Sequence, residues 1–254
     1  MSGIRIISVY PLGIESFRVQ WDLEQAVTNQ GPFNFTLLRS GSPAGPWEVV
    51  ASDMGDVYTK EDTRSLIHGM GKDLWYKVTA NSGDFDSPAR NVRQELPRAK
   101  YLIWRKMVND QELLLRKMNG VEVSVLKLRH WGERCASCRD KKTGHIVVKN
   151  CLVCYGTGFT GGYFAPIRTL CHFKPAPVGT DMRPDTSVPE IVTTNGYMLA
   201  YPLVKRGDIL VERSVNIRWE VTVTQETEIF RNAVHQDITL SRLPDAHIIY
   251  KFSV

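Results

Sequence analysis

The sequence predicts a mainly β, multidomain protein with an N-terminal β-sandwich, one long helix, a four-cysteine zinc knuckle and a C-terminal small β-barrel or sandwich. Three observations predict this class. Apolar and polar residues alternate with period two in short segments toward both ends, the period becomes helical between Leu96 and Gly120, and two Cys-x-x-Cys pairs follow. A chain of 254 residues commonly holds more than one domain. We expect its parts at 1–95, 96–120, 121–164 and 165–254.

The alternation of apolar and polar residues with period two is clearest in residues 1–95. The segments Phe17–Trp21, Phe33–Leu37 and Trp75–Thr79 read as short strands, and turn signals such as Gly31-Pro32 and Ser82-Gly83 separate them. Short strands with turns at this spacing are typical of a small β-sandwich.

This part of the chain resembles a fibronectin type III domain. Residues 17–21, 33–40 and 45–50 resemble strands B, C and C′ of that family, and residues 73–80 and 86–89 resemble its strands F and G. The resemblance implies that Trp21 is a core residue and that Tyr76 is the tyrosine of the sandwich corner. It also implies a domain that displays or spaces other parts and holds no catalytic centre.

The segment from Leu96 to Gly120 has the period of a single helix of about five turns. Pro97 suits the first turn, where no amide partner is needed, and Gly120 suits the C-terminal end. The apolar positions share one broad face: Ala99, Ile103, Trp104, Met107, Val108, Leu115 and Met118. A face of this width packs in the core of its own domain or lines an assembly interface, and the sequence leaves both open.

The cysteine pairs predict a metal site. Cys135-x2-Cys138 and Cys151-x2-Cys154 are separated by twelve residues, 139–150. Zn²⁺ prefers a tetrahedron of thiolates, and two such turns brought face to face supply one. Because four protein thiolates leave no open coordination position, we expect one structural zinc per chain and no catalysis at the metal.

Gly156 and Gly158 follow the second pair and allow positive φ, which turns amide groups back toward the sulfurs. The alternative to a metal site is a disulfide framework, but five cysteines in this length are few for one. The fifth, Cys171, is followed by His172. It is either a buried thiol beside a solvated imidazole or a spare zinc ligand.

The C-terminal part again reads as β. Strands are expected there at 197–201, 208–212, 218–223, 238–243 and 246–250, and a further strand at 121–126 is expected at the start of the cysteine segment. A proline-rich stretch, 175–184, predicts a long loop before most of them, because proline blocks regular pairing. This many short strands close most naturally into a small barrel or sandwich.

Charge and motifs limit the function classes. The formal charge of +5 permits contact with phosphate or an acidic partner without requiring it. No apolar run approaches the ~18 residues of a membrane span, and no secretory leader is evident, so we expect synthesis in a reducing cytoplasm and no membrane partner. The six histidines are dispersed, and no nucleophile, base or second metal cluster has catalytic spacing. We therefore do not expect an enzyme.

The C-terminal half resembles a family of virion proteins. Residues 202–211, 219–223 and 236–243 resemble the small β-barrel of head-closure and neck proteins of tailed bacteriophages, and the cysteine segment resembles inserts in such proteins. The resemblance implies a structural virion protein, made in the cytoplasm of the bacterial host. It implies a ring of six or twelve copies at the head–tail junction, between the portal or adaptor and the tail proteins. Non-specific contact with DNA in the channel is compatible with this position.

Two other functions stay open. A zinc-ribbon nucleic-acid-binding protein would use Arg139, Lys141 and Lys142 as its contact, and its affinity would fall steeply with salt. The segment Cys154–Gly158 also resembles one cysteine repeat of DnaJ-type chaperones. That family has four such repeats and a His-Pro-Asp motif, which this chain lacks.

Overall fold

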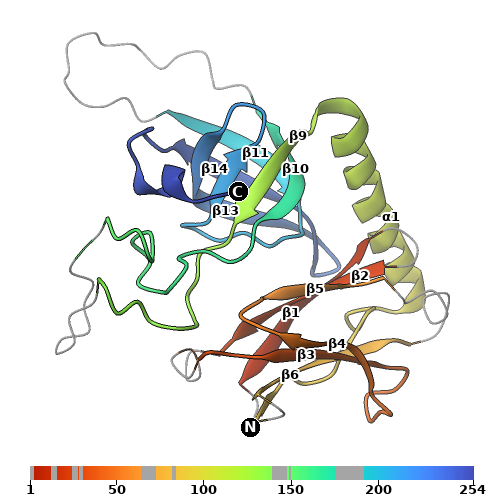
Figure 1. The fold of residues 1–254 in the computed structure, drawn as a ribbon. Helices are drawn as coiled ribbons and strands as arrows, with labels where there is room; N and C mark the ends of the chain where they lie inside the picture. Colours follow the sequence, from red (N-terminus) through yellow and green to blue (C-terminus); the bar gives the residue numbers. More distant parts are fainter. Residues whose placement is uncertain are drawn as a thin grey trace. The chain divides into compact units, whose positions relative to one another are not determined.

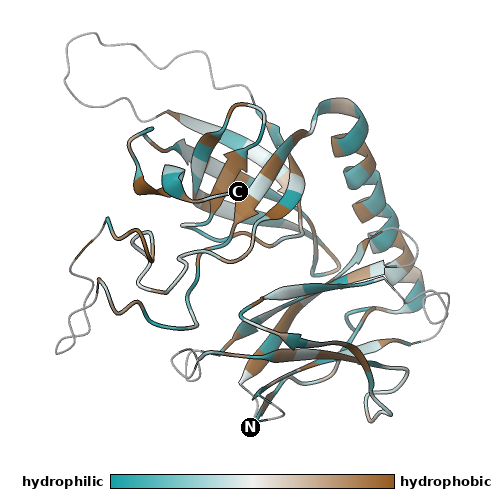
Figure 2. Ribbon diagram, in the orientation of Figure 1, coloured by the Kyte–Doolittle hydropathy of each residue, from teal (hydrophilic) through white to brown (hydrophobic). Residues whose placement is uncertain are grey.

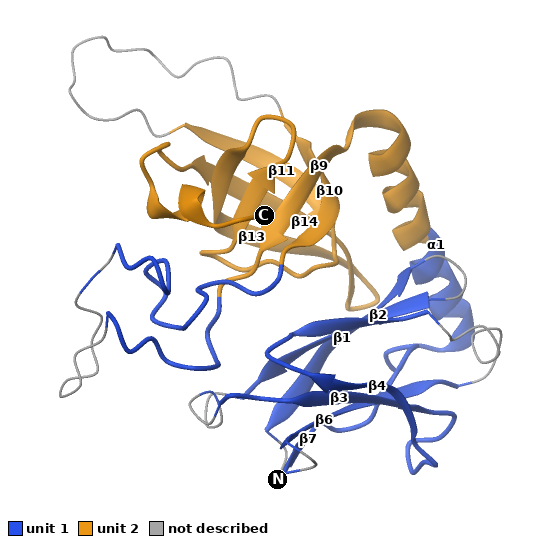
Figure 3. Ribbon diagram, viewed as in Figure 1, with its two compact units in different colours: residues 1–106, 129–165 blue, residues 107–128, 166–254 orange. Residues whose placement is uncertain are grey.

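The computed structural model divides the chain into two compact units. Residues 1–106 and 129–165 form the first, and residues 107–128 and 166–254 form the second (Figure 3). The structure describes residues 3–12, 16–24, 28, 31–63, 73–81, 84–138, 148, 150–174 and 192–254. The expected proline-rich loop at 175–184 lies outside the described residues.

Two antiparallel sheets make up most of the first unit (Figure 1). One has the order β1 (Ile4–Leu12), β2 (Ser16–Leu23), β5 (Thr59–Asp62). The other has the order β4 (Glu48–Met54), β3 (Phe35–Ser40), β6 (Trp75–Ala80), β7 (Phe85–Asp86), and β8 (Arg90–Asn91) also pairs with β6. Their inner faces share a core: the rings of Trp21 and Phe35 are 5.6 Å apart, and Trp21 and Tyr76 are both buried.

A buried polar network joins the two sheets. The Tyr76 hydroxyl donates to Oδ2 of Asp62 at 2.8 Å, and Nη1 of Arg39 donates to Oδ1 of the same carboxylate at 3.1 Å. Arg39 also donates through Nε to Glu48 at 3.0 Å. Burial, and after it the Asp62 charge, raises the pKa of Tyr76, so the phenol stays protonated as a donor. Because Asp62 belongs to β5 while Arg39 and Tyr76 belong to the other sheet, the network holds the sandwich together.

The expected helix forms as α1 (Arg98–Leu114), followed by a turn of π-helix at Leu115–Asn119. Its buried stripe is Tyr101, Trp104, Val108 and Leu115. The apolar face is narrower than the sequence suggested, because only this stripe is packed; Ala99, Ile103 and Met118 are exposed. Figure 2 shows apolar and hydrophilic segments mixed along α1. Within the described residues no helix is long and apolar enough to span a membrane.

Gly120 ends this helix for a steric reason. Its amide donates to the Leu115 carbonyl at 2.9 Å, which closes the π-helical turn. A Cβ at this position would lie 2.3 Å from the Leu115 oxygen, so no other residue fits without moving the backbone.

The second unit is a closed six-stranded barrel in the order β10-β11-β14-β13-β12-β9. Its strands are β9 (Val121–Leu126), β10 (Ile167–Phe173), β11 (Thr193–Leu199), β12 (Ile209–Glu212), β13 (Ile217–Ile229) and β14 (Asn232–Arg242). The sequence grouped 121–126 with the cysteines, but β9 pairs with both β10 and β12 and places Val123 and Val125 in the barrel core. The cysteine segment is therefore an insertion between two neighbouring barrel strands.

A buried ion pair fastens the start of that insertion to the barrel. Nζ of Lys127 lies 3.3 Å from Oδ2 of Asp208 and donates to the Leu203 carbonyl at 2.8 Å. The other oxygen of Asp208 accepts the Leu128 amide at 2.8 Å. The charges are thus compensated, as buried charges must be.

The expected last strand, 246–250, does not form. A 3-10 turn spans Ile248–Lys251 instead, and His247 caps it through Nδ1. Ile249 is buried, and the guanidinium of Arg218 donates to the carbonyls of Ile249 and Phe252. Burial of the Ile249 side chain and the hydrogen bonds from Arg218 to two carbonyls therefore replace the strand pairing that was expected.

Candidate metal centre

The four cysteines lie on two turns that the backbone holds side by side. A bridge pairs Arg134 with Phe159, and the Cys135 amide donates to the Gly158 carbonyl at 3.0 Å. After the second pair, Gly156 and Gly158 have φ of 84° and 81°, the positive values that the sequence predicted. The short pairing and the reversed backbone together bring both cysteine pairs to one point.

The thiols form one buried cluster. The Sγ atoms of Cys135, Cys138, Cys151 and Cys154 all lie within 4.8 Å of one another, and all four side chains are buried. The Cys135–Cys151 sulfurs are 3.8 Å apart and the Cys138–Cys154 sulfurs 3.2 Å apart; no disulfide joins them. The disulfide alternative is therefore not what the structure contains.

The surroundings shift the pKa values of two of the four thiols in opposite directions. The backbone N–H groups of Cys154 and Val153 face Cys151 and lower its pKa to about 7, so it readily becomes a thiolate. Burial, followed by hydrogen bonding to the sulfurs of Cys154 and Cys135, raises the pKa of Cys138. Four thiolates this close need a cation among them, because they repel one another in a buried site.

The donor set fits a tetrahedral metal ion. Zn–S bonds of about 2.3 Å in a tetrahedron require sulfurs about 3.8 Å apart, and the Cys135–Cys151 separation has this value. Binding would spread the closer Cys138–Cys154 pair by a few tenths of an ångström. Four soft ligands in this arrangement suit Zn²⁺ or an iron–sulfur centre, and they leave no position for a substrate.

An aromatic anchor fixes the cysteine segment to the sandwich within the first unit. Trp131 is fully buried, and its ring lies 5.4 Å from Phe35, 5.8 Å from Phe33 and 4.7 Å from Phe164. Phe33 and Phe35 belong to the sandwich, whereas Trp131 and Phe164 flank the cysteines. The two parts therefore share one core.

Charged groups reinforce this attachment. Arg129 donates to Asp56 at 3.1 Å and to the Tyr163 carbonyl at 3.1 Å, and His130 contacts the carboxylate of Asp22. Asp56 also accepts the Phe33 amide at 3.1 Å. These residues were not predicted from the sequence, although Trp131-Gly132 just ahead of the first cysteine pair was an available signal.

Of the remaining candidates, the structure describes only Cys171. Cys171 lies in the barrel core, as a buried thiol and not as a spare ligand. His145 and the basic residues Arg139, Lys141 and Lys142, on which the nucleic-acid alternative depends, lie outside the described residues.

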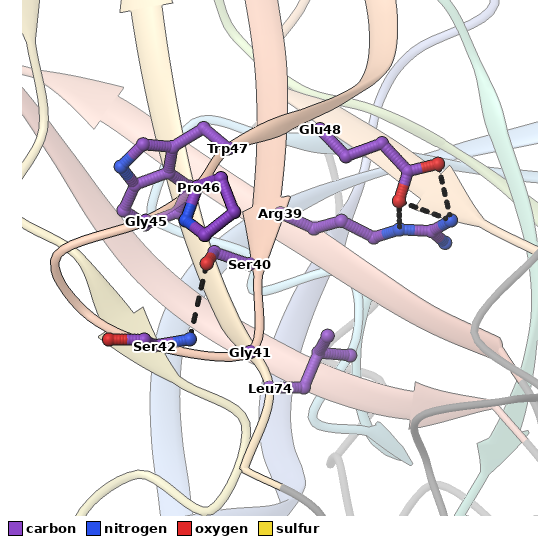
Figure 4. A pocket seen from close by; sticks show the side chains of 9 residues that line it. All are labelled: Arg39, Ser40, Gly41, Ser42, Gly45, Pro46, Trp47, Glu48 and Leu74. Atoms are coloured by element: carbon purple, nitrogen blue, oxygen red, sulfur yellow. Dashed lines mark hydrogen bonds and ion pairs between the residues drawn. The ribbon is translucent and has the colours of Figure 1, made fainter.

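A separate pocket of about 340 Å³ lies at the turn between β3 and β4 (Figure 4). Pro46, Trp47 and Leu74 give it an apolar lining. The charged groups at its wall, Arg39 and Glu48, already bind each other at 3.0 Å. A pocket whose charges satisfy one another offers little to orient a ligand, so the cysteine cluster is the stronger site.

Comparison with known family models, with curated proteins and with solved structures finds no match to this chain.

Proposed function

We propose that this chain is a structural virion protein of the phage neck, which forms a ring at the head–tail junction and holds one structural zinc per chain. The resemblance of its barrel and cysteine segment to head-closure proteins motivates the proposal. The sandwich order, in which β2 lies between β1 and β5 and β3 lies between β4 and β6, is compatible with the fibronectin type III resemblance.

The closed donor set supports a structural role for the metal. Four buried thiolates fill the coordination sphere of Zn²⁺ and leave no position for a substrate. The role of the ion is therefore to contribute folding energy to a segment with little core of its own. That contribution matters in a ring, where each copy must present rigid surfaces to two neighbours.

The proposed assembly is supported mainly by the exposed apolar face of α1 and of the turn after it. Five large apolar side chains there are between 45% and 76% exposed: Leu102, Ile103, Leu113, Leu114 and Met118. Leu102 and Leu113 are eleven residues apart, as are Ile103 and Leu114, so each pair returns to the same side after about three turns. An exposed apolar face of this length is typical of a subunit interface.

A ring fits this face better than an isolated dimer does. Basic residues outnumber acidic ones on α1 and the turn after it, where Asp110 and Glu112 are accompanied by Arg98, Lys100, Arg105, Lys106, Arg116 and Lys117. Like charges would meet if two copies of the face paired with each other, whereas a head-to-tail contact presents the face to a different surface of the next copy. Portal or adaptor proteins on one side and tail proteins on the other complete the proposed partners.

The test compares two glutamate substitutions in the full chain. Leu113→Glu places a charge on the proposed interface, and Val215→Glu places one at a similarly exposed apolar position on the β12–β13 turn. We expect light scattering and electron microscopy to show rings for the parent and for Val215→Glu, and smaller species for Leu113→Glu. Rings that persist in Leu113→Glu, or a parent that never assembles alone or with portal protein, would contradict the proposal.

A further inference from the structure

Among the described residues, the outer edge of β13 has no partner strand over its second half. β13 pairs with β14 from Trp219 to Ile229, yet β12 covers its other side only from Ile217 to Glu220. Backbone hydrogen bonds of 2.9 Å join Val221 to the loop before β12. Beyond that point no strand of the described residues lies beside the edge from Val223 to Ile229. Its outward N–H and C=O groups are a template for another chain.

The side chains along this edge favour an added strand. Val223, Thr224, Thr227 and Ile229 are β-branched, and Val223 is 59% exposed. Proteins usually protect an edge of this length with lysine, proline or a short strand. Neither lysine nor proline occurs between Val223 and Ile229, and the pairing with β14 shifts register once before this edge, between Val221 and Val223, and once within it, between Thr227 and Glu228.

The charge of the edge selects its partner. Glu226 and Glu228 are two residues apart, so they project to the same face of β13, and both are exposed. Burial by its surroundings, together with the charge of Glu228, raises the pKa of Glu226, although the charge of Lys205 acts in the opposite direction, so the negative charge of the pair is only partly compensated. The same edge of a second copy would place carboxylates opposite carboxylates, which is destabilising. A strand with lysine or arginine at alternate positions would instead compensate both.

The turn at the end of the edge is conformationally costly. Phe230 and Arg231 have φ of 54° and 64°, values that asparagine and glycine adopt at least cost in a two-residue hairpin. Phe230 is also exposed, next to the edge, where it can cover an apolar residue of an incoming strand.

We propose that the outer edge of β13, from Val223 to Ile229, receives an extended segment of another protein that carries lysine or arginine at alternate positions. The segment adds to the barrel as a strand: backbone hydrogen bonds supply affinity, and Glu226 and Glu228 supply the preference for a basic sequence. This inference does not depend on the neck proposal, because any extended basic segment would serve.

Hydrogen exchange on the full chain tests it with two synthetic probes. One is the capped peptide Thr-Lys-Val-Lys-Val-Lys-Thr, and the other has glutamate in place of each lysine. We expect the lysine peptide to slow amide exchange between Val223 and Ile229 by about tenfold at saturation, and the glutamate peptide to leave it unchanged. No protection by either peptide, equal protection by both, or protection confined to other strands would overturn the proposal.

Reversing the charges of the two glutamates distinguishes binding at the β13 edge from non-specific attraction of the peptide by the net charge of the protein. Glu226→Lys with Glu228→Lys should reverse the preference, so that the glutamate peptide protects the edge and the lysine peptide does not. The matched control is Glu122→Lys with Glu212→Lys, which changes the net charge equally on β9 and β12 and should keep the preference for lysine. If both double variants came to prefer the glutamate peptide, the preference would follow the net charge of the protein, and the edge would not be what recognises the peptide.

Discussion

Replacing Trp131 with alanine should destabilise the first unit more than any exposed substitution. The indole is 0% exposed, and its ring packs on Phe164 at 4.7 Å, Phe35 at 5.4 Å and Phe33 at 5.8 Å. Truncating a buried tryptophan to alanine costs about 3–5 kcal/mol, because the transfer energy is lost and a cavity remains. For a unit of about 140 residues, each kcal/mol lowers Tm by about 3 °C, so we expect a fall of about 10–15 °C.

Scanning calorimetry of the full chain measures this directly, since the two units can give separate transitions. Trp47→Ala is the control: Trp47 is only half-buried, at the turn after β3, and its loss should lower Tm by less than about 3 °C. If Trp131→Ala changed Tm no more than Trp47→Ala does, the cysteine segment would not share a core with the sandwich.

Three further predictions concern the cysteines and the barrel. Cys138→Ser should abolish stoichiometric zinc and lower stability, measured as metal per chain and Tm, while Cys171→Ser keeps its zinc; equal zinc in both variants would exclude the four-thiolate site. Gly196→Ala should destabilise the barrel by about 1–3 kcal/mol, since its Cβ would lie 3.1 Å from Sγ of Cys171. Adding Cys171→Ala should recover part of that loss in denaturant titrations, and strict additivity of the two changes would argue against the contact. Burial raises the pKa of Cys171 to about 12, from an ordinary 9.0. The unfolded thiol therefore ionises first, and stability should fall by up to about 1.4 kcal/mol per pH unit between about pH 9 and 12. The free energy of unfolding of Cys171→Ala should fall less over this range, and identical pH profiles for the variant and the parent would contradict the raised pKa of Cys171.

The cluster of four cysteines could be predicted from the sequence because its signal is local. Two residues between cysteines define a turn whatever the rest of the chain does, and two such turns define a tetrahedron. Strand alternation was informative for the same reason, and β2, β6 and β9 overlap the expected segments closely.

The packing partners of the cysteine segment could not be predicted, because they lie far from it in the sequence. Trp131 meets Phe33 and Phe35 across almost a hundred residues, and β9 joins β10 only after the whole insertion. Neither pairing leaves a periodic trace in the sequence. The last segment was predicted wrongly for a related reason: the run at 246–250 was expected to be a strand, but Arg218, far from it in the sequence, binds the carbonyls of Ile249 and Phe252, and a 3-10 turn forms.

Native mass spectrometry of the purified full chain at modest salt tests the central claim most directly, because it counts metal and subunits together. The account predicts a closed ring of six or twelve copies with one zinc in each. A monomer that carries no zinc would contradict both the metal site and the assembly, and a zinc-bound monomer that carries nucleic acid would favour the zinc-ribbon alternative.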